Sequence, residues 1–403
     1  MIFLTGVILV AACGPTSTPE ITWKSIEKDL QAQLITTGDS TVIDLPAGHY
    51  MFTRSLLLDG KSSVTIRGAG MDETVLSFAM QEEGAEGIKV SNAQNIVLED
   101  FTVQDAKGDN IKVTDTYGIT FRRLKSEWTG EPKETNGAYA FYPVLSKQVV
   151  VEECMAIGSS DAGIYVGQSD SVIIRNNTVY HNVAGIESEN SRWVEIYGNE
   201  TFDNTGGILV FDLPGLTQSG HTTRVYDNRV YRNNYKNFAP AGNIVATVPP
   251  GTGLMLLATR NIEIFDNEII DNRTIGIGVA SYDLVEAMGG GNSSGASEIP
   301  EDQKAPYNPY YNDLFIHHNK ITNKHWFPTL KNDFGLLFLT KFPFSTPDIV
   351  VDGITGGEPL NICLQENGEI TYANLDAAND FEGLSQDMKA VECRGEEIAP
   401  IFL

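Results

Sequence analysis

The segment between residues 161 and 212 repeats with a period of 22 residues. Gly163-Ile164 is followed by Gly185-Ile186 and then by Gly207-Ile208. A fixed period of this length is typical of stacked supersecondary units, each of which buries one face against the next. Each half-repeat alternates apolar and polar residues and ends in Asn, Asp or Gly, a pattern that favours short strands and turns. Three short strands in each turn of about 22 residues predict an all-β chain, folded as a right-handed, single-stranded parallel β-helix.

The register of this repeat can be followed from residue 87 to residue 319. The second strand of successive turns ends in asparagine at five positions, Asn177, Asn199, Asn228, Asn267 and Asn319. Stacked Asn side chains at a bend hydrogen-bond along the solenoid axis and tolerate left-handed backbone geometry, so we predict a structural asparagine ladder. Cys154 falls in the same column one turn earlier, and we expect a buried, unreactive thiol there.

Both ends of the solenoid require a cap, because an open end exposes apolar interior and unpaired strand edges. Residues 20–40 carry apolar side chains near a helical period and predict a short amphipathic helix. The strand periodicity fades after Lys341. We therefore assign residues 20–344 to the capped β-helix and residues 345–403 to a C-terminal capping tail. A disulfide between Cys363 and Cys393 is expected to close a loop of 30 residues in this tail and to contribute about 3 kcal/mol.

The first thirteen residues are apolar and end in small residues before Cys13. This segment resembles a bacterial lipobox, in which residues 1–12 are a signal peptide, Cys13 is the lipidated mature N-terminus and residues 13–19 form a tether. A buried first strand is the alternative interpretation. The expected location is the bacterial cell envelope, lipid-anchored at the outer membrane, the periplasm or the cell surface, where disulfides persist.

The composition gives 28 basic and 53 acidic residues, a net charge of −25. Such a charge argues against nucleic-acid partners and predicts repulsion of polyanionic polysaccharides unless a metal ion or a local basic patch intervenes. Lys89, Lys107 and Lys112 belong to a basic cluster that can supply such a patch or form an ordinary solvated face. The expected partners are a polysaccharide and, through the lipid anchor, a membrane, with the chain acting as a monomer.

Alternate residues of a strand face opposite sides, so the residues between the inward-facing Ile and Val positions point outward in columns with a spacing of about 4.8 Å. These columns gather flat aromatic rings and polar groups, which suit sugar rings. The substrate-binding candidates on this face are Tyr139, Phe141, Tyr142, Gln168, Asn190, Phe211 and Lys112. In the alternative interpretation, residues 214–252 cover the face and the aromatic residues form a satellite core.

Glu187 and Glu189 are two residues apart on the same face, so their carboxylates are expected roughly 5–7 Å apart, a separation that overlaps those of glycosidases. Asp161 and Asp212 on neighbouring turns are alternative partners, and Tyr165 is a candidate acid or base if a cation lowers its pKa. The full catalytic set is Glu187, Glu189, Tyr165, Asp212 and Asp161, with His181 and His221 as further possible bases. The carboxylates and Asn190 also suggest Ca²⁺ as the one candidate cofactor, although no EF-hand or nonapeptide calcium repeat occurs.

The chain resembles a bacterial family of exported parallel β-helix repeat proteins that includes many lipoproteins. The resemblance covers most of residues 40–403, and its most specific blocks are SDAGIYVGQS at 160–169, VAGIESENS at 183–191, NTGGILVFDLP at 204–214 and the Cys363/Cys393 tail. It implies the fold and export but no particular reaction. The DPHD motif of mannuronan epimerases and the aspartate set of polygalacturonases are absent from the sequence.

Three hypotheses about function follow from these observations. The first is a carbohydrate-active enzyme that acts on uronate-containing chains by elimination, epimerisation or hydrolysis. The second is a non-catalytic surface lipoprotein that binds a glycan or a protein through the same face. The third is a purely structural solenoid, which the concentration of aromatic residues on three turns disfavours.

Overall fold

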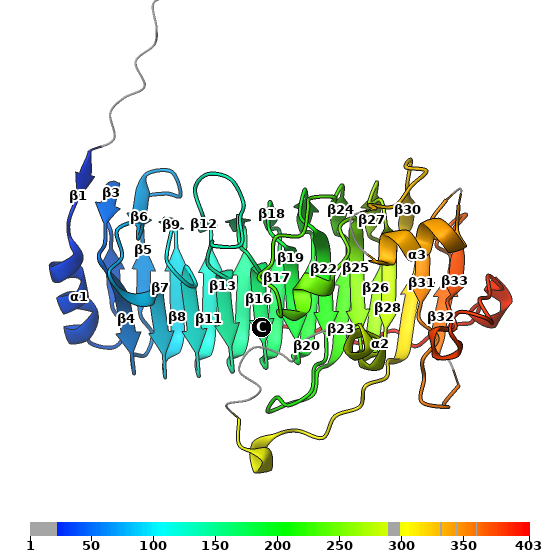
Figure 1. Cartoon of the computed structure of the whole chain (residues 1–403). Coiled ribbons are helices and arrows are strands. Elements are labelled where there is room, and N and C mark those ends of the chain that lie inside the picture. The colour runs from blue at the N-terminus through cyan, green and yellow to red at the C-terminus, as the bar shows by residue number, and fades with distance from the viewer. Residues whose placement is uncertain (1–21, 289–298, 331–332, 344, 360) are drawn as a thin grey trace, which may run out of the picture.

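The computed structural model describes residues 22–288, 299–330, 333–343, 345–359 and 361–403. The chain winds into a β-helix whose strands form three parallel sheets of 11 strands each (Figure 1). The predicted all-β solenoid is therefore confirmed. None of the helices in the described part of the chain combines the length and the hydropathy that a transmembrane span requires.

One turn of the solenoid contributes one strand to each sheet. In the central turn these strands are β16 (Ala162–Gly167) in sheet C, β17 (Asp170–Arg175) in sheet B and β18 (Thr178–Tyr180) in sheet A. The corners between them are tight because single residues there adopt left-handed backbone angles, with φ of 47° at Gln168 and 56° at Asn176. Ile164 pairs with Ile186, which pairs with Ile208, so the 22-residue period of the sequence is the register of the sheet.

Sheet A also contains β1 (Trp23–Lys24), β3 (Gly48–Met51), β6 (Thr74–Ser77), β9 (Thr102–Gln104), β12 (Lys125–Glu127), β15 (Met155–Ile157), β21 (Glu200–Phe202), β24 (Arg229–Tyr231), β27 (Glu268–Ile270) and β30 (Lys320–Thr322). Sheet B also contains β2 (Val42–Asp44), β5 (Thr65–Arg67), β8 (Gln94–Glu99), β11 (Tyr117–Arg122), β14 (Lys147–Glu152), β20 (Arg192–Tyr197), β23 (His221–Tyr226), β26 (Arg260–Phe265), β29 (Asn312–His317) and β32 (Ile362–Gln365). Sheet C also contains β4 (Arg54–Asp59), β7 (Glu83–Ser91), β10 (Ile111–Thr114), β13 (Tyr139–Val144), β19 (Ala184–Glu189), β22 (Gly206–Phe211), β25 (Thr252–Leu257), β28 (Ile275–Ala280), β31 (Ile349–Val351) and β33 (Tyr372–Asn374). The α-helices are α1 (Glu27–Thr36), α2 (Tyr282–Ala287) and α3 (Asp333–Lys341), and short 3₁₀ helices include η1 (Ile244–Thr247), η3 (Glu301–Gln303), η4 (Ala377–Asn379) and η5 (Met388–Ala390).

The predicted asparagine ladder stands at the corner between sheets B and A. The side-chain amide of each ladder residue donates to the Oδ1 of the next at 2.9–3.0 Å, from Asn177 through Asn319, and the ladder continues to Asn367. A second ladder, Asn182, Asn204, Asn233 and Asn272, occupies the corner between sheets A and C and was not predicted. Cys154 is buried in the first column, as predicted, and burial raises the pKa of its thiol to about 12.

Ring stacks reinforce the outer faces of sheets A and B. Tyr197, Tyr226 and Phe265 follow one another on sheet B with centroid separations of 4.8 Å and interplanar angles of 9°. Tyr180 and Phe202 stack in the same way on sheet A. Because each ring covers the face of its neighbour, these aromatic residues offer mainly their edges and stabilise the solenoid.

The N-terminal cap is α1, which is shorter than the predicted 20–40 helix. Leu30 and Leu34 are buried on its inner side. Gln31 makes two hydrogen bonds with the backbone of Leu57 in β4, at 3.1 Å and 2.9 Å, and so satisfies part of that edge strand.

The C-terminal region continues the solenoid beyond the expected boundary at residue 345. Strands β31, β32 and β33 extend sheets B and C, and the predicted disulfide joins Cys363 to Cys393 with an S–S distance of 2.03 Å. After the disulfide, residues 394–403 run back along the outer face of sheet B, so the C-terminus lies beside the middle of the solenoid (Figure 1). The backbone N–H groups of Ile398 and Ile401 donate to the buried carboxylates of Glu263 and Glu195, each at 3.0 Å.

We call residues 396–403, which make these two contacts, the strap. Removing the strap is expected to lower the free energy of unfolding by about 2 kcal/mol. Two charge-assisted hydrogen bonds are lost, and the freed carboxylates regain only part of that energy from water. Urea unfolding of the truncated chain measures the effect. The double substitution I398P/I401P removes only the two N–H donors and should reproduce most of the loss. Equal stability of all three chains would contradict the assigned role of the strap.

Candidate functional site

The register of sheet C corrects one part of the predicted binding face. Phe141 pairs with Ile111 and Ile164, and its side chain is fully buried in the solenoid interior. The interpretation of Phe141 as an outward, substrate-binding residue is therefore wrong. Tyr142 takes the outward position instead, beside Lys112.

The central part of the outward face of sheet C is covered. Tyr139, Tyr165 and Phe211 form a second hydrophobic cluster together with side chains from residues 235–250 and neighbouring segments. Tyr165 is 3% exposed, Glu187 1% and Glu189 4%. The residues do point away from the solenoid interior, but the insertion covers them, as the alternative interpretation anticipated.

Three carboxyl groups are enclosed in this cluster with the tyrosines. The Tyr139 hydroxyl donates to Oδ2 of Asp161 at 3.3 Å, and the Tyr165 hydroxyl donates to Oε1 of Glu189 at 2.9 Å. Burial raises the pKa of Asp161 to about 7 and that of Glu189 to about 8, and the hydrogen bonds from the two tyrosines oppose these shifts. Burial also raises the pKa of Glu187, whose Oε2 has no hydrogen-bond partner within the described part of the chain. At neutral pH Glu189 is therefore mostly protonated and Asp161 about half protonated.

The tyrosines are protonated as well. The ring centroids of Tyr139 lie 4.5 Å from Tyr142 and 4.6 Å from Tyr165. Burial, followed by the nearby carboxylates, raises the pKa of all three hydroxyls above the ordinary value. The condition set for Tyr165 as a base, a pKa lowered by a cation, is not met in this environment.

Other predicted site residues anchor the loop that follows β22. Asp212 accepts from the backbone N–H of Gly220 at 2.6 Å and pairs with Arg260 at 3.2 Å. Asn190 donates to the carbonyl oxygens of Leu213 and Gln218. Gln168 accepts from the backbone N–H of Thr217 at 2.8 Å. These polar atoms are engaged in holding the covering loop, which is a structural role.

The open part of the face begins next to the covered cluster. We call Glu86, Lys89, Asp109, Lys112 and Tyr142, all half-buried, the open patch. The Lys112 ammonium lies 4.7 Å from the Tyr142 ring centroid, and Lys89 pairs with Glu86 at 3.5 Å. Burial raises the pKa of Asp109 to about 6, although Lys112 opposes the shift.

Sequence reasoning missed Asp109. It precedes the first strand of its turn, in nearly the same place as Asp161 two turns later, and that correspondence was the available signal. Asp109 accepts a hydrogen bond from the Tyr139 backbone N–H, while the Tyr139 hydroxyl binds Asp161. The two aspartates therefore lie on either side of one tyrosine, at the boundary between the open patch and the covered cluster.

The two histidines lie in other surroundings. His221 Nδ1 lies 2.7 Å from the Thr222 hydroxyl, and His181 packs against the rings of Tyr180 and Tyr235. In the described ranges no group of three or more His, Cys, Asp or Glu residues is arranged to hold a metal ion.

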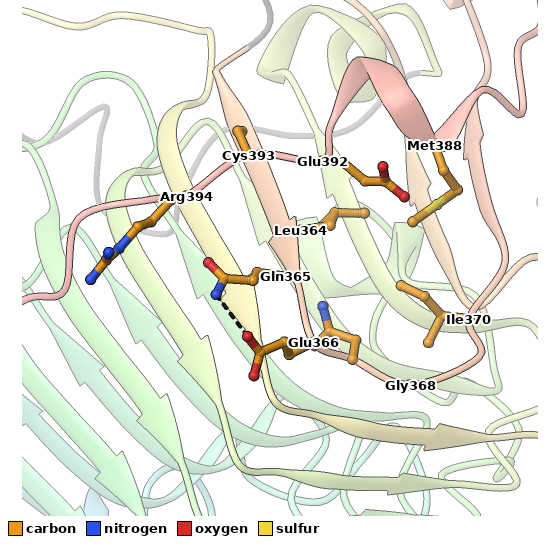
Figure 2. A pocket seen from close by; sticks show the side chains of 10 residues that line it. Leu364, Gln365, Glu366, Gly368, Ile370, Met388, Glu392, Cys393 and Arg394 are labelled. Atoms are coloured by element: carbon orange, nitrogen blue, oxygen red, sulfur yellow. Dashed lines mark hydrogen bonds between the residues drawn. The ribbon is translucent and has the colours of Figure 1, made fainter.

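A cavity of about 430 Å³ lies at the opposite end of the molecule, where the last turn meets the disulfide-bonded tail. Figure 2 shows Leu364, Ile370 and Met388 around it, with Gln365 donating to Glu366 at 3.1 Å. The two carboxylates that line this cavity belong to Glu366 and Glu392, and both residues are exposed. Enclosed titratable groups gather on sheet C instead, which makes sheet C the candidate site.

Comparison with known proteins agrees with this architecture. Residues 55–217 match the family model described as right handed beta helix region. The protein is a right-handed parallel β-helix. None of the curated proteins matches the chain in sequence.

Similar solved structures include the A-modules of two mannuronan C-5 epimerases of Azotobacter vinelandii. The AlgE4 module shares 16% sequence identity with this chain at a TM-score of 0.50, and the match covers 85% of this chain and 89% of that module. The AlgE6 module shares 15% sequence identity at a TM-score of 0.50, and the match covers 86% of this chain and 90% of that module. A DFA-IIIase mutant from Arthrobacter chlorophenolicus A6 shares 10% with a TM-score of 0.49, covering 84% and 89%. At these identities the likeness of the two A-modules establishes the fold alone.

Proposed function

We propose that this protein is a carbohydrate-active enzyme that binds a uronate-containing polysaccharide on sheet C and hydrolyses it by acid–base catalysis at Asp109 and Asp161. The observation that carries the proposal is the placement of these two aspartates, both with pKa values raised by burial, on either side of Tyr139. Neighbouring carboxyl groups whose pKa values are raised toward neutrality by burial are candidates for acid–base catalysis.

Two lysines of the open patch are available to pair with an anionic substrate. Lys89 and Lys112 occupy adjacent turns on the same outward column, and Tyr142 continues that column. Two ammonium groups about 4.8 Å apart can pair with the carboxylates of a uronate chain, and the Tyr142 ring offers an apolar surface for a sugar. Glu86 and Asp109 balance these two charges within the patch, so the lysines offer local pairing partners and no net positive charge.

The proposed roles follow from the pKa values. Asp109, with a pKa of about 6, is mostly ionised at neutral pH and serves as the base that activates water. Asp161, with a pKa of about 7, is protonated in about half of the molecules at neutral pH and serves as the acid for the leaving oxygen, while the hydrogen bond from Tyr139 positions its carboxyl group. Two turns separate the backbone positions of these residues by about 10 Å. Elimination is disfavoured because the nearby tyrosines are held protonated.

The substitutions D109N and D161N test this assignment. Each is expected to lower the release of reducing ends from uronate-containing glycans at least tenfold while leaving glycan binding intact, because acid–base groups contribute about 10²- to 10⁴-fold. D115N changes an exposed aspartate of the same turn and should have no effect. K112Q should weaken binding of uronate chains but not of neutral ones. Full activity in both aspartate variants would rule out the mechanism.

A second candidate function is non-catalytic glycan binding by the same face. The covered state of Asp161, Glu187, Glu189 and Tyr165 favours it, because these groups contact no solvent-borne chain while residues 235–250 are in place. Retention of a glycan on an array without new reducing ends or unsaturated products, with calcium or with a chelator, would distinguish this function from hydrolysis.

We also propose export to the bacterial cell envelope and lipid attachment at Cys13, with the chain acting as a monomer. Cys13, the predicted signal peptide and the tether lie outside the described residues. The disulfide between Cys363 and Cys393 supports an oxidising compartment. Metabolic labelling with a fatty acid, compared between the parent chain and C13S, tests the attachment.

A further inference from the structure

A group of large apolar side chains is exposed near the C-terminal end of the solenoid, apart from the candidate site. Trp326 is 74% exposed, Phe327 55%, Leu330 48% and Leu336 52%. The first three lie on the loop that follows β30, and Leu336 lies on α3. A Cβ added at Gly335 would meet the carbonyl oxygen of Thr329 at 1.8 Å, so the loop and α3 are in direct contact. We call these four side chains the apical patch.

The backbone of the loop is anchored on both sides of the two aromatic residues. Before them, the backbone N–H of Lys324 donates to Asp271 and that of His325 donates to Asn323, each at 3.0 Å. After them, Thr329 donates from its backbone N–H to Thr274 at 3.2 Å and from its hydroxyl to Pro250. The loop therefore holds Trp326 and Phe327 outward at its tip, and their exposure is part of the fold.

Two exposed cations lie near the apical patch on a strongly acidic chain. Lys324 and Arg273 are exposed beside the loop, whereas Lys320 pairs with Glu268 at 3.1 Å and Asp271 accepts from the Lys324 backbone N–H. Burial and the charge of Arg273 lower the pKa of His325. Exposed tryptophan and phenylalanine beside lysine are the side chains that proteins place at the boundary between lipid headgroups and acyl chains.

The geometry points to the apical patch as a membrane-docking surface that inserts Trp326 and Phe327 into a lipid interface. A sugar would use the flat ring but gains nothing from Leu330 and Leu336, whereas a lipid interface accepts all four side chains. The convex loop tip also differs from the concave sites that hold small ligands.

The position of the patch within the fold agrees with this occupant. The described chain begins next to β1, the first strand of sheet A, and the patch follows β30, the last (Figure 1). Ten strand spacings separate these strands by roughly 50 Å. The 21 residues outside the described part at this end contain the proposed lipid anchor. Contacts at both ends of sheet A would lay the solenoid along the membrane and leave the open patch of sheet C free for a polymer. The docking surface itself rests on the exposed residues and does not require the proposed enzymatic activity.

The test uses the full chain carrying C13S, so that no covalent lipid contributes, with vesicles of phosphatidylcholine. The chain is expected to float with the vesicles, with tryptophan fluorescence shifted to the blue and quenched by brominated lipid. The variant W326S/F327S should reduce partitioning at least tenfold, with unchanged circular dichroism. W193S removes a tryptophan that is 43% exposed on β20 and should leave partitioning unchanged.

Three outcomes would overturn the inference. One is the absence of vesicle binding by the C13S chain. Another is equal loss of binding in W193S and W326S/F327S. The last is that W326S/F327S leaves vesicle binding unchanged but alters another property. A change in self-association, seen in sedimentation, would assign the apical patch to a second copy of the chain. A change in glycan retention would assign it to a sugar.

Discussion

Replacing Glu189 by Gln is expected to stabilise the protein at alkaline pH by on the order of 4 kcal/mol. Burial raises the pKa of Glu189 from 4.5 to about 8 in the folded chain. Between these two pH values the folded chain binds more protons than the unfolded chain, so stability falls as pH rises through the window. Gln keeps the shape and the acceptor for the Tyr165 hydroxyl but cannot ionise. The stability of E189Q should therefore depend less on pH than that of the parent.

Urea unfolding below pH 4.5 and above pH 8 measures the expected difference. The two chains should be about equally stable at the lower pH, where the parent carboxyl is protonated in both states, and E189Q should be the more stable at the higher pH. E134Q changes an exposed acid on the loop before β13 and should stay within about 0.5 kcal/mol of the parent at both pH values. If E189Q were the less stable chain above pH 8, the Glu189 carboxylate of the folded parent would have to be ionised and paired with a cation.

Most of the fold could be predicted from the sequence because it depends on local periodicity. The period of 22 residues is the register that joins Ile164, Ile186 and Ile208, and the ladder asparagines mark one corner of each turn. The prediction failed at Phe141, where the insertion at 129–135 shifts the register. Aligning Gly137-Ala138 with Gly163-Ile164 misplaces the strand by three residues, and an odd shift exchanges the inward and outward faces.

The candidate site was less predictable because its exposure depends on packing between distant segments. Tyr139, Tyr165, Glu187 and Glu189 point away from the solenoid interior, as expected from the sequence, but their environment comes from residues 235–250, which carry no periodic pattern. Asn243 of this insertion donates to Asp161 at 3.1 Å across 82 positions of the chain. The same burial that hides Glu187 and Glu189 raises the pKa values of both, so neither property could be obtained from the sequence of one strand.

Removing a single side-chain amide from the asparagine ladder should destabilise the protein by about as much as E189Q stabilises it at alkaline pH. Asn228 donates to the Ile196 carbonyl at 2.8 Å and to Asn267 at 3.0 Å, and its Oδ1 accepts both from the backbone N–H and from the side-chain amide of Asn199. N228A leaves several of these buried groups without a partner, each at a cost of about 1–3 kcal/mol. We expect the free energy of unfolding to fall by about 4 kcal/mol in urea titrations followed by circular dichroism.

The matched control is C154A, because Cys154 lies at the start of the same column, is equally buried and carries no amide. Its backbone N–H keeps the hydrogen bond to Asn177, so the variant measures the loss of buried volume alone, and a cost of about 1 kcal/mol is expected. Equal costs in N228A and C154A would show that filling the corner, and not hydrogen bonding along it, stabilises the turns. A larger loss of unfolding free energy in N228A, with a broader unfolding transition, would show instead that the ladder couples neighbouring turns. A solenoid unfolds cooperatively only where the interfaces between its turns are strong.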